Sequence, residues 1–367
     1  MSSIQNADAR VYTIPTDLPE GDGTFAWRST TMTIVQVTAA GQTGTGWTYG
    51  APECAAIVHS TLAKVIEGQD PMNIPELWEA MVRAVRNSGR QGAIGYAISA
   101  VDAALWDLKA RILGVSLQAL LGAQRRDVPV YASGGFTTYS DRELQDQIAE
   151  WLDEGSTAIK IKIGESWGTR LERDIARIEK ARQLVGPEVK LFVDANGGYS
   201  AKQAIRIMDQ VEGSDVKWFE EPVSSDNLAG LAEVRAAVSA DVAAGEYGYD
   251  IFTFRRLCES GAVDVLQADV TRCGGLTEWL RVAAVAASFG LQLSGHCAPN
   301  LHAHVAAAIP NLRHLEWFHD HDRIERLFFD GALTPRDGVV TLNADALGNG
   351  LTLREADAER YLVKSYR

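Results

Sequence analysis

From Val128 onward, short apolar runs alternate regularly with amphipathic helical stretches. Helical patterns fill the gaps between the runs, as in Thr169–Val185, Ala201–Val211 and Leu276–Phe289. Strands that alternate with helices along a chain must be parallel, and eight of them can close into a barrel. The sequence therefore predicts an eight-stranded α/β barrel. Its expected strands are Val128–Ser133, Ala158–Ile163, Lys190–Asp194, Val216–Glu220, Asp241–Gly245, Val263–Ala268, Leu291–Gly295 and Arg313–Glu316.

The region before the barrel has a different organisation. Two β-rich stretches, Arg10–Ile14 and Thr31–Thr38, flank an expected loop at Thr16–Ser29 that contains proline, glycine and charged residues. Between residues 93 and 112, apolar side chains recur at the spacing of a helix that faces a core. Strands followed by helices indicate an α+β domain.

At the end of the chain, the alternation of strand and helix patterns that indicates the barrel stops. No clear helix follows the eighth apolar run, where Pro335 and the strand-like Val339–Leu342 come instead. We expect this stretch to return to the first domain. The sequence therefore predicts a modified TIM barrel of the (β/α)7β type at 126–335, with an α+β capping domain formed by 1–125 and completed by 336–367.

Two lysines lie on the second expected strand, Lys160 and Lys162 in the run Ile159-Lys-Ile-Lys-Ile163. Alternation along a strand puts both on one face. A strand covered on both sides should be nearly all apolar, so lysines inside a barrel cost desolvation free energy unless something pairs with them. An exposed edge strand with solvated lysines is the alternative that this segment leaves open.

Three carboxylates follow at a regular interval. Asp194, Glu220 and Glu246 end the third, fourth and fifth strands, 26 and 26 residues apart. At that period they would converge on the C-terminal rim of the barrel, where they would repel one another unless a cation lies between them. Carboxylate ligands without His or Cys suit a hard ion, Mg²⁺ above others. Helix N-capping is the alternative for any one of them.

The series continues around the rim. Asp269 lies 23 residues after Glu246, His296 lies 27 after Asp269, and Glu316 lies 20 after His296. An Asp on a neighbouring strand commonly fixes the tautomer of a His and raises its basicity. We therefore predict that His296 and Asp269 form a pair at the same site.

Composition limits the partners. The net charge is −13, from 35 basic and 48 acidic residues, which argues against nucleic acid or an anionic membrane and leaves cation binding open. The first eight residues lack signal-peptide features, and no apolar run reaches about 18 residues. We expect a soluble, cytoplasmic protein with free thiols, since no disulfide-type or CxxC spacing joins Cys54, Cys258, Cys273 and Cys297.

Taken in order, the Lys-x-Lys, Asp-x-Asn, Glu-Glu-Pro, Glu, Asp and His motifs resemble the enolase superfamily, and within it the mandelate racemase branch of the mandelate racemase/muconate lactonizing enzyme family. The resemblance covers nearly the whole chain, up to Glu359–Val363. It implies that Asp194, Glu220 and Glu246 bind one Mg²⁺ per subunit. A homo-oligomer is also expected.

The same resemblance assigns roles to the other rim residues. Lys162 would be the base on one face of the substrate, and Lys160 would help to hold the substrate carboxylate. His296, backed by Asp269, would serve the opposite face as base or acid. Glu316 would lie near the substrate carboxylate as a hydrogen-bond donor or electrostatic partner.

This chemistry is physically reasonable. A hydrogen alpha to a carboxylate is too weakly acidic for a side-chain base alone, whereas a divalent ion stabilises the enediolate by several kcal/mol. Lys160 and the Mg²⁺ are expected to lower the pKa of Lys162.

Three reactions remain open after proton removal. They are racemisation or epimerisation of a 2-hydroxy acid, dehydration by β-elimination, and cycloisomerisation of an anhydro-sugar acid or sugar lactone. The segments Gln267–Gly275, Gly295–Asn300 and Phe318–His321 resemble the acid-sugar members of the branch. We therefore favour a lyase, an acid-sugar dehydratase, over an isomerase.

The substrate is expected to be a small sugar acid or 2-hydroxy acid held by Asn196 and by the loop over the barrel mouth. Asp22 and Trp27 on that loop could contact its distal end, or simply be solvated. A non-catalytic protein that binds Mg²⁺ and an acid sugar is the alternative from another class. Binding alone requires neither Lys162 nor His296, which argues against it.

Overall fold

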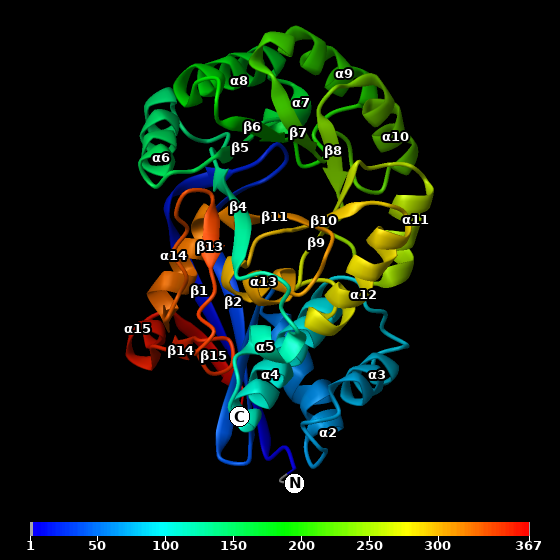
Figure 1. Cartoon of the computed structure of the whole chain (residues 1–367), viewed down its shortest axis with the longest axis vertical. Coiled ribbons are helices and arrows are strands. Elements are labelled where there is room, and N and C mark those ends of the chain that lie inside the picture. The colour runs from blue at the N-terminus through cyan, green and yellow to red at the C-terminus, as the bar shows by residue number, and fades with distance from the viewer. Residues whose placement is uncertain (1–2, 367) are drawn as a thin grey trace.

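Eight parallel strands close into the expected barrel in the computed structural model, which describes residues 3–366 (Figure 1). The strands pair in chain order, and the last of them pairs with the first to close the ring. Each begins and ends within two residues of its predicted bounds. They are β4 (Asp127–Gly134), β5 (Ala158–Lys162), β6 (Lys190–Asp194), β7 (Val216–Glu220), β8 (Asp241–Ala244), β9 (Val265–Ala268), β10 (Gln292–Gly295) and β11 (Leu312–Phe318).

Helices surround this ring, as the alternating pattern predicts. They lie in the segments that connect successive strands. They are α6 (Asp141–Asp153), α7 (Glu165–Gly168), α8 (Leu171–Val185), α9 (Ala201–Gln210), the 3₁₀ turn Glu212–Ser214, α10 (Leu228–Ala237), α11 (Ile251–Glu259), α12 (Gly275–Ser288) and α13 (Pro299–Ala307).

A further helix, α14 (His319–Phe328), directly follows β11, although we predicted no clear helix there. Its buried face includes Asp320, His321 and Glu325 beside the apolar Ile324 and Phe328. These polar residues occupy positions of the buried face where a helical pattern normally shows apolar residues. They can be buried there because their hydrogen-bond partners come from other parts of the chain. Glu325, for example, accepts hydrogen bonds from Trp47 Nε1 and Tyr49 Oη of the first domain, both at 3.1 Å.

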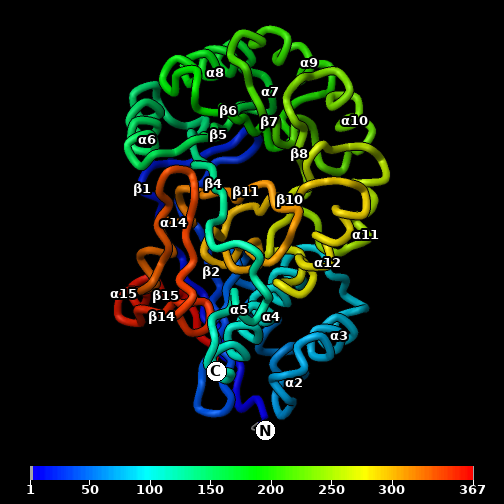
Figure 2. The backbone as a smooth tube through the Cα atoms, viewed as in Figure 1, coloured from blue at the N-terminus to red at the C-terminus, as the bar shows by residue number. Residues whose placement is uncertain are grey.

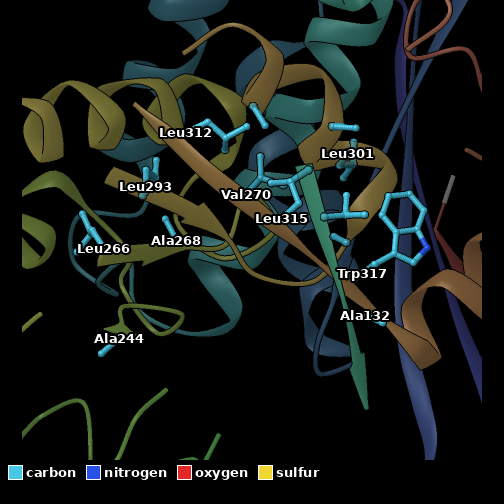
Figure 3. Packing of buried hydrophobic residues seen from close by; sticks show 14 of the residues in the cluster. Ala132, Ala244, Leu266, Ala268, Val270, Leu293, Leu301, Leu312, Leu315 and Trp317 are labelled. Carbon is cyan, nitrogen blue, oxygen red and sulfur yellow. The ribbon is translucent and has the colours of Figure 1, made fainter. Parts of the chain in front are cut away.

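Side chains alternate between the two faces of the barrel wall. Ile159 and Ile161 of β5 belong to the main apolar core between strands and helices. Figure 3 shows residues of the same core from neighbouring strands, such as Leu266, Leu293 and Leu315. A second apolar cluster, which includes Tyr131, Phe192 and Trp218, is formed by the alternate residues of the strands, whose side chains lie on the interior face of the barrel. Lys160 and Lys162 share this interior face, so the alternative of an exposed edge strand is wrong.

The capping domain is a four-stranded antiparallel sheet covered by helices. The strand order is β15, β1, β2, β3. The strands are β1 (Asn6–Gly21), β2 (Ala26–Ala39), β3 (Gln42–Tyr49) and β15 (Leu362–Tyr366). The helices are α1 (Glu53–Ile57), a π-helical turn (Val58–Leu62), α2 (Ala63–Ile66), α3 (Ile74–Ala84), α4 (Ala93–Leu113) and α5 (Leu117–Leu121).

The expected loop at Thr16–Ser29 is largely a β-ribbon. After an irregularity between Pro15 and Glu20, β1 pairs with β2 again through Glu20–Trp27 and Gly21–Ala26. Figure 2 shows this ribbon running from the capping domain up to the barrel. Proline, glycine and charge made the segment look like a loop, but its three carboxylates have hydrogen-bond partners: Asp17 in His319, Glu20 in Trp27, and Asp22 in the turn of the ribbon.

The C-terminal segment pairs with strands of both the barrel and the capping domain. β13 (Val339–Thr341) pairs with β4 of the barrel, while β15 pairs with β1 of the capping sheet. Between them, β14 (Thr352–Leu353) pairs with β12 (Phe329–Asp330) and leads into α15 (Glu355–Glu359). The segment thus meets the barrel first and returns to the capping domain from Gly348 onward, where Leu117 N donates to Gly348 O and Asn349 N donates to Asp107 Oδ1. The domain bounds 1–125, 126–335 and 336–367 stay a prediction. Within residues 3–366, no helix combines the length and apolar character needed to cross a bilayer.

Helix α4 packs directly against strand β3 at two glycines, Gly44 and Gly46. A Cβ atom at Gly46 would collide with the backbone of α4 at Ala100 and Ala104. Neither atom belongs to a flexible side chain, so the helix itself would have to move. This close approach fixes the sheet, and with it the β1–β2 ribbon, against the helix layer.

We predict that Gly46→Ala lowers the free energy of unfolding by about 1–3 kcal/mol, the usual cost of overpacking. Urea denaturation followed by circular dichroism measures the change. Gly213→Ala is the matched control, because a Cβ atom there meets nothing within 4 Å. Equal stabilities of the two variants would contradict this account of the packing.

Candidate active site

The ends of three adjacent strands bring the predicted residues together. The strand register places Lys162 of β5 beside Asp194 of β6, and Asp194 beside Glu220 of β7. Glu246 follows β8 by two residues. Parallel strands end at one rim of a barrel, which is why residues far apart in sequence meet here.

Asp194, Glu220 and Glu246 form a buried carboxylate cluster. One oxygen from each lies within 4.8 Å of the others. Oε2 of Glu246 is buried and makes no well-aligned hydrogen bond within the described residues, although His296 Nε2 lies 3.2 Å away. An orphaned carboxylate oxygen beside two further carboxylates, with no His or Cys among the three, fits a hard divalent cation such as Mg²⁺.

Lys160 lies beneath this cluster and is fully buried. Its Nζ is 2.6 Å from Glu220 Oε1 and 2.7 Å from Glu316 Oε1, and it lies 5.2 Å from the centre of the Tyr131 ring. Burial lowers the pKa of Lys160, but these carboxylates raise it well above its usual value overall. Lys160 is therefore a fixed cation that holds two carboxylates in place, and it does not line the cavity described below.

Lys162 reaches the cavity and forms an ion pair with Asp194. Burial lowers the pKa of Lys162, and Lys160 lowers it further. Asp194, together with Glu316 and Glu220, raises it, and the net shift is upward. The effect of Lys160 thus has the expected sign. The expected net lowering does not hold for the side chains alone, because the effect of Asp194 is larger.

His296 and Asp269 form the predicted pair. Nδ1 of His296 is 2.8 Å from Asp269 Oδ2, and its Nε2 is 3.2 Å from Glu246 Oε2. Burial raises the pKa of Asp269, but the hydrogen bond from His296 and the charge of Arg272 together lower it below its usual value, so Asp269 stays ionised. Burial lowers the pKa of His296, and the charge of Glu246 contributes to a net rise. The pair can hold or release a proton at Nε2.

Glu316 is held by three donors. Its Oε1 accepts a hydrogen bond from Ser133 Oγ at 2.6 Å, besides the contact with Lys160, and its Oε2 accepts one from Cys297 N at 3.1 Å. Burial raises the pKa of Glu316, but Lys160, His296 and Lys162 together lower it, and the net result lies well below the usual value. An ionised carboxylate cannot donate a hydrogen bond, so this geometry favours the electrostatic role of Glu316 over the donor role.

Arg272 is a partly buried cation of the site that sequence reasoning missed. Its Nη1 is 3.1 Å from Glu246 Oε1, and its Nε is 3.4 Å from Asp269 Oδ2. The guanidinium also lies 5.2 Å from the centre of the Tyr247 ring. It thus links the carboxylate cluster to the His296–Asp269 pair. Its position three residues after Asp269 is the signal that could have found it.

The charges explain why a cation fits. Five buried carboxylates, Asp194, Glu220, Glu246, Asp269 and Glu316, surround the site against three permanent cations, Lys160, Lys162 and Arg272. A divalent ion removes this excess of negative charge. Without it, the carboxylates repel one another, which contributes, after burial, to raising the pKa of Glu220 to about 7.

A cavity of about 200 Å³ lies over these groups, and its volume suits one sugar acid molecule. The β1–β2 ribbon supplies Asp22, Trp27 and Thr30 to its wall. Asn196, which we predicted as a substrate residue together with Asp22 and Trp27, also lines it. The other lining residues are Lys162, Glu246, Tyr247, Arg272, His296, Cys297, Phe318 and His321.

The ribbon is anchored to the barrel mouth by backbone hydrogen bonds. Thr137 N donates to Gly21 O, and Trp167 N donates to Gly23 O, both at 2.8 Å. These bonds join the turn of the ribbon to the segments that follow β4 and β5. The capping domain therefore completes the wall of the cavity.

Two family models match the chain. The model described as "Enolase C-terminal domain-like" matches residues 143–357, and "Mandelate racemase / muconate lactonizing enzyme, N-terminal domain" matches residues 18–122. Together they cover most of the barrel and of the capping domain.

Three curated relatives show the range of named activities. D-galactarolactone cycloisomerase of Agrobacterium fabrum is 35% identical, over 70% of this chain and 68% of the relative. L-talarate/galactarate dehydratase of Salmonella typhimurium is 34% identical, over 80% and 72%. Arabinonate dehydratase of Saccharolobus solfataricus is 31% identical, over 85% and 85%.

Solved structures agree with the fold. A mandelate racemase/muconate lactonizing enzyme-like protein from Rubrobacter xylanophilus has a TM-score of 0.95 at 43% identity, covering 98% of this chain and 100% of that one. The Salmonella typhimurium dehydratase, crystallised with Mg and L-lyxarohydroxamate, has a TM-score of 0.90 at 28% identity, covering 100% and 94%.

Glu20 supports the cavity wall from behind. It is fully buried, and Trp27 Nε1 donates a hydrogen bond to its Oε2 at 2.8 Å. Burial raises the pKa of Glu20 to about 9, and the nearby Asp320 carboxylate adds to the shift. Glu20 therefore carries a proton at neutral pH and positions Trp27 as a neutral group.

This shift predicts how stability depends on pH. A folded-state pKa near 9 against 4.5 in the unfolded chain means that unfolding releases a proton between these values. The stabilisation is complete below pH 4.5 and is lost as the pH rises toward 9. We therefore expect the free energy of unfolding of the wild type to fall, relative to Glu20→Gln, between pH 4.5 and about pH 9.

Urea midpoints measured across this pH range provide the test. Glu188→Gln, at an exposed position before β6, is the control and should run parallel to the wild type. Parallel profiles of Glu20→Gln and the wild type would show that Glu20 is not a buried neutral group.

Proposed function

The chain belongs to the mandelate racemase/muconate lactonizing enzyme family of the enolase superfamily, and we propose that it is a Mg²⁺-dependent acid-sugar dehydratase. It removes the proton alpha to the carboxylate of a sugar acid and then eliminates the β-hydroxyl. The observation that carries this proposal is the meeting of Lys162 and the His296–Asp269 pair at one cavity with three crowded carboxylates.

Asp194, Glu220 and Glu246 are the residues that would hold the ion. When bound, Mg²⁺ stabilises the negative charge that develops on the substrate carboxylate during proton removal. The remaining charged residues keep its ligands in position. Lys160 holds Glu220 from below, and Arg272 holds Glu246 from the side of Asp269.

Lys162 and His296 are the two groups that move protons. They project from opposite parts of the rim, since β4 and β11 separate their strands on one side and β6 to β9 separate them on the other. A planar enediolate between them presents one face to each. Asp269 fixes the tautomer of His296, so that Nε2 is the atom that exchanges a proton at the cavity.

Lys162 and His296 together carry out the proton transfers of the elimination. One of them takes the proton from carbon 2, and the electron pair forms the enediolate. As the bond between carbon 3 and its oxygen breaks, a general acid protonates the departing hydroxyl, which leaves as water. The enol product then takes up a proton at carbon 3 and becomes a 2-keto-3-deoxy acid. General acid or base assistance typically contributes about 100- to 10,000-fold to each step.

A cycloisomerase is the second candidate, because one of the relatives is named for that reaction. It would open or rearrange a ring in a lactone or anhydro-sugar acid and lose no water. The two reactions share the same proton removal, so only the product separates them. We further propose a reducing compartment such as the cytoplasm, since all four cysteines are buried and unbridged.

Variants of the two proton-transfer residues test the proposal. We expect Lys162→Ala and His296→Asn each to reduce formation of the 2-keto-3-deoxy acid by at least about 100-fold, because each removes one general acid or base. Proton exchange at carbon 2 with deuterated solvent then assigns the roles. Exchange retained in His296→Asn makes Lys162 the base, and exchange retained only in Lys162→Ala makes His296 the base.

The controls are Lys202→Ala and His59→Asn, at exposed positions of the same residue types. Both should keep wild-type rates. The assignment of this site fails if both active-site variants retain full elimination activity. Exchange without any keto product, with each variant acting on one enantiomer only, would instead indicate a racemase.

A further inference from the structure

We infer that the substrate is a monocarboxylate sugar acid whose far end is neutral and hydroxylated, and that the cavity discriminates against dicarboxylates. This inference rests on the proposed function, since it assumes that the reacting carboxylate lies at the buried carboxylate cluster. It concerns the opposite wall of the cavity, formed by the β1–β2 ribbon and by the start of α14.

The cations that line the cavity are already engaged. Lys162 is paired with Asp194, and Arg272 contacts both Glu246 and Asp269. Both belong to the half of the site that binds the reacting carboxylate. Arg28, the one arginine of β2, is exposed and does not line the cavity. A second carboxylate at the far end would therefore meet no free cation among the described lining residues.

The ribbon places an anion at that far wall instead. Asp22 lines the cavity, and its Oδ1 accepts backbone hydrogen bonds from Thr24 N at 2.6 Å and Phe25 N at 2.8 Å. These bonds fix the position of the carboxylate. Burial raises the pKa of Asp22, and Lys162 together with the two backbone bonds opposes this rise without cancelling it. An ionised Asp22 accepts hydrogen bonds from sugar hydroxyls and repels a carboxylate.

His321 supplies a donor without a charge. Ala298 N donates to its Nδ1 at 3.2 Å, which leaves the proton on Nε2. The ring is stacked on Tyr49 at a centroid distance of 3.5 Å. Burial lowers the pKa of His321 to about 3, in agreement with a neutral ring. A neutral N–H group binds a hydroxyl oxygen well but leaves a carboxylate without a counter-charge.

The remaining polar atoms fit the same ligand. Oδ1 of Asn196 is buried and has no partner within the described residues, so it can accept a hydrogen bond from a hydroxyl. The indole N–H of Trp27 is already used by Glu20, so Trp27 offers the cavity only apolar ring atoms. The far wall thus combines the Asp22 carboxylate as acceptor, His321 as neutral donor and the apolar ring of Trp27, and the amide of Asn196 beside it adds an acceptor and a neutral donor, which suits a polyol.

Matched pairs of acids test this inference. Gluconate and glucarate, or galactonate and galactarate, share their stereochemistry and differ only in the oxidation of the last carbon. With the Mg²⁺-loaded protein, we expect the monocarboxylate to bind with a Kd at least about tenfold lower by calorimetry, and to show the higher kcat/KM where it is turned over. Asp22→Asn, which keeps the shape and the acceptor oxygen, should bring the two Kd values together. Asp209→Asn, an exposed control on α9, should not.

Each result decides a separate point. Dicarboxylates that bind as tightly as monocarboxylates, or monocarboxylates that do not bind, would overturn the inference. A preference unchanged in Asp22→Asn would overturn the role of Asp22. If no acid of either kind exchanged its carbon-2 proton, the proposed reaction would fail, while the ratio of Kd values would still decide whether the cavity prefers one carboxylate.

Discussion

Two lysines buried among carboxylates hold the catalytic rim together. Lys160 has no exposed surface and contacts Glu220 and Glu316, while Lys162 pairs with Asp194 one layer above. Removing either partner would leave an unpaired buried charge, which is far more costly than losing a surface ion pair. The strand register places these side chains beside one another, and it also brings together the carboxylates that we propose as ligands of the ion.

The capping domain provides the part of the cavity wall that the barrel does not form. The barrel supplies the proton-transfer groups, and the β1–β2 ribbon supplies Asp22, Trp27 and Thr30 as the opposite wall. Glu20 and Asp320 anchor these side chains, since Trp27 donates to Glu20 and Thr30 donates to Asp320. The residues that we propose for proton transfer and those that we propose for substrate selection thus belong to different domains.

The sequence predicts the barrel well because each strand carries its own apolar run, and the rim because its residues recur with the strand period. Prediction from the sequence fails where the structure of a segment depends on contacts with residues far away in the chain. The ribbon at Thr16–Ser29 looked like a loop since its charges are paired by tertiary contacts, and α14 was missed since its buried face is polar. Arg272 was missed because nothing in its local pattern shows that it reaches Glu246.

The central claim is that this site removes a proton alpha to a carboxylate with the help of Mg²⁺. Proton NMR of a turned-over sugar acid in deuterated water, with the wild-type protein and with or without a chelator, tests it most directly. The account predicts that the carbon-2 proton signal disappears only when Mg²⁺ is present, and that the product gains one deuterium at carbon 3. Loss of the signal at the same rate under chelation, or a product whose new carbon-3 hydrogen is the original carbon-2 hydrogen and not deuterium, would contradict it.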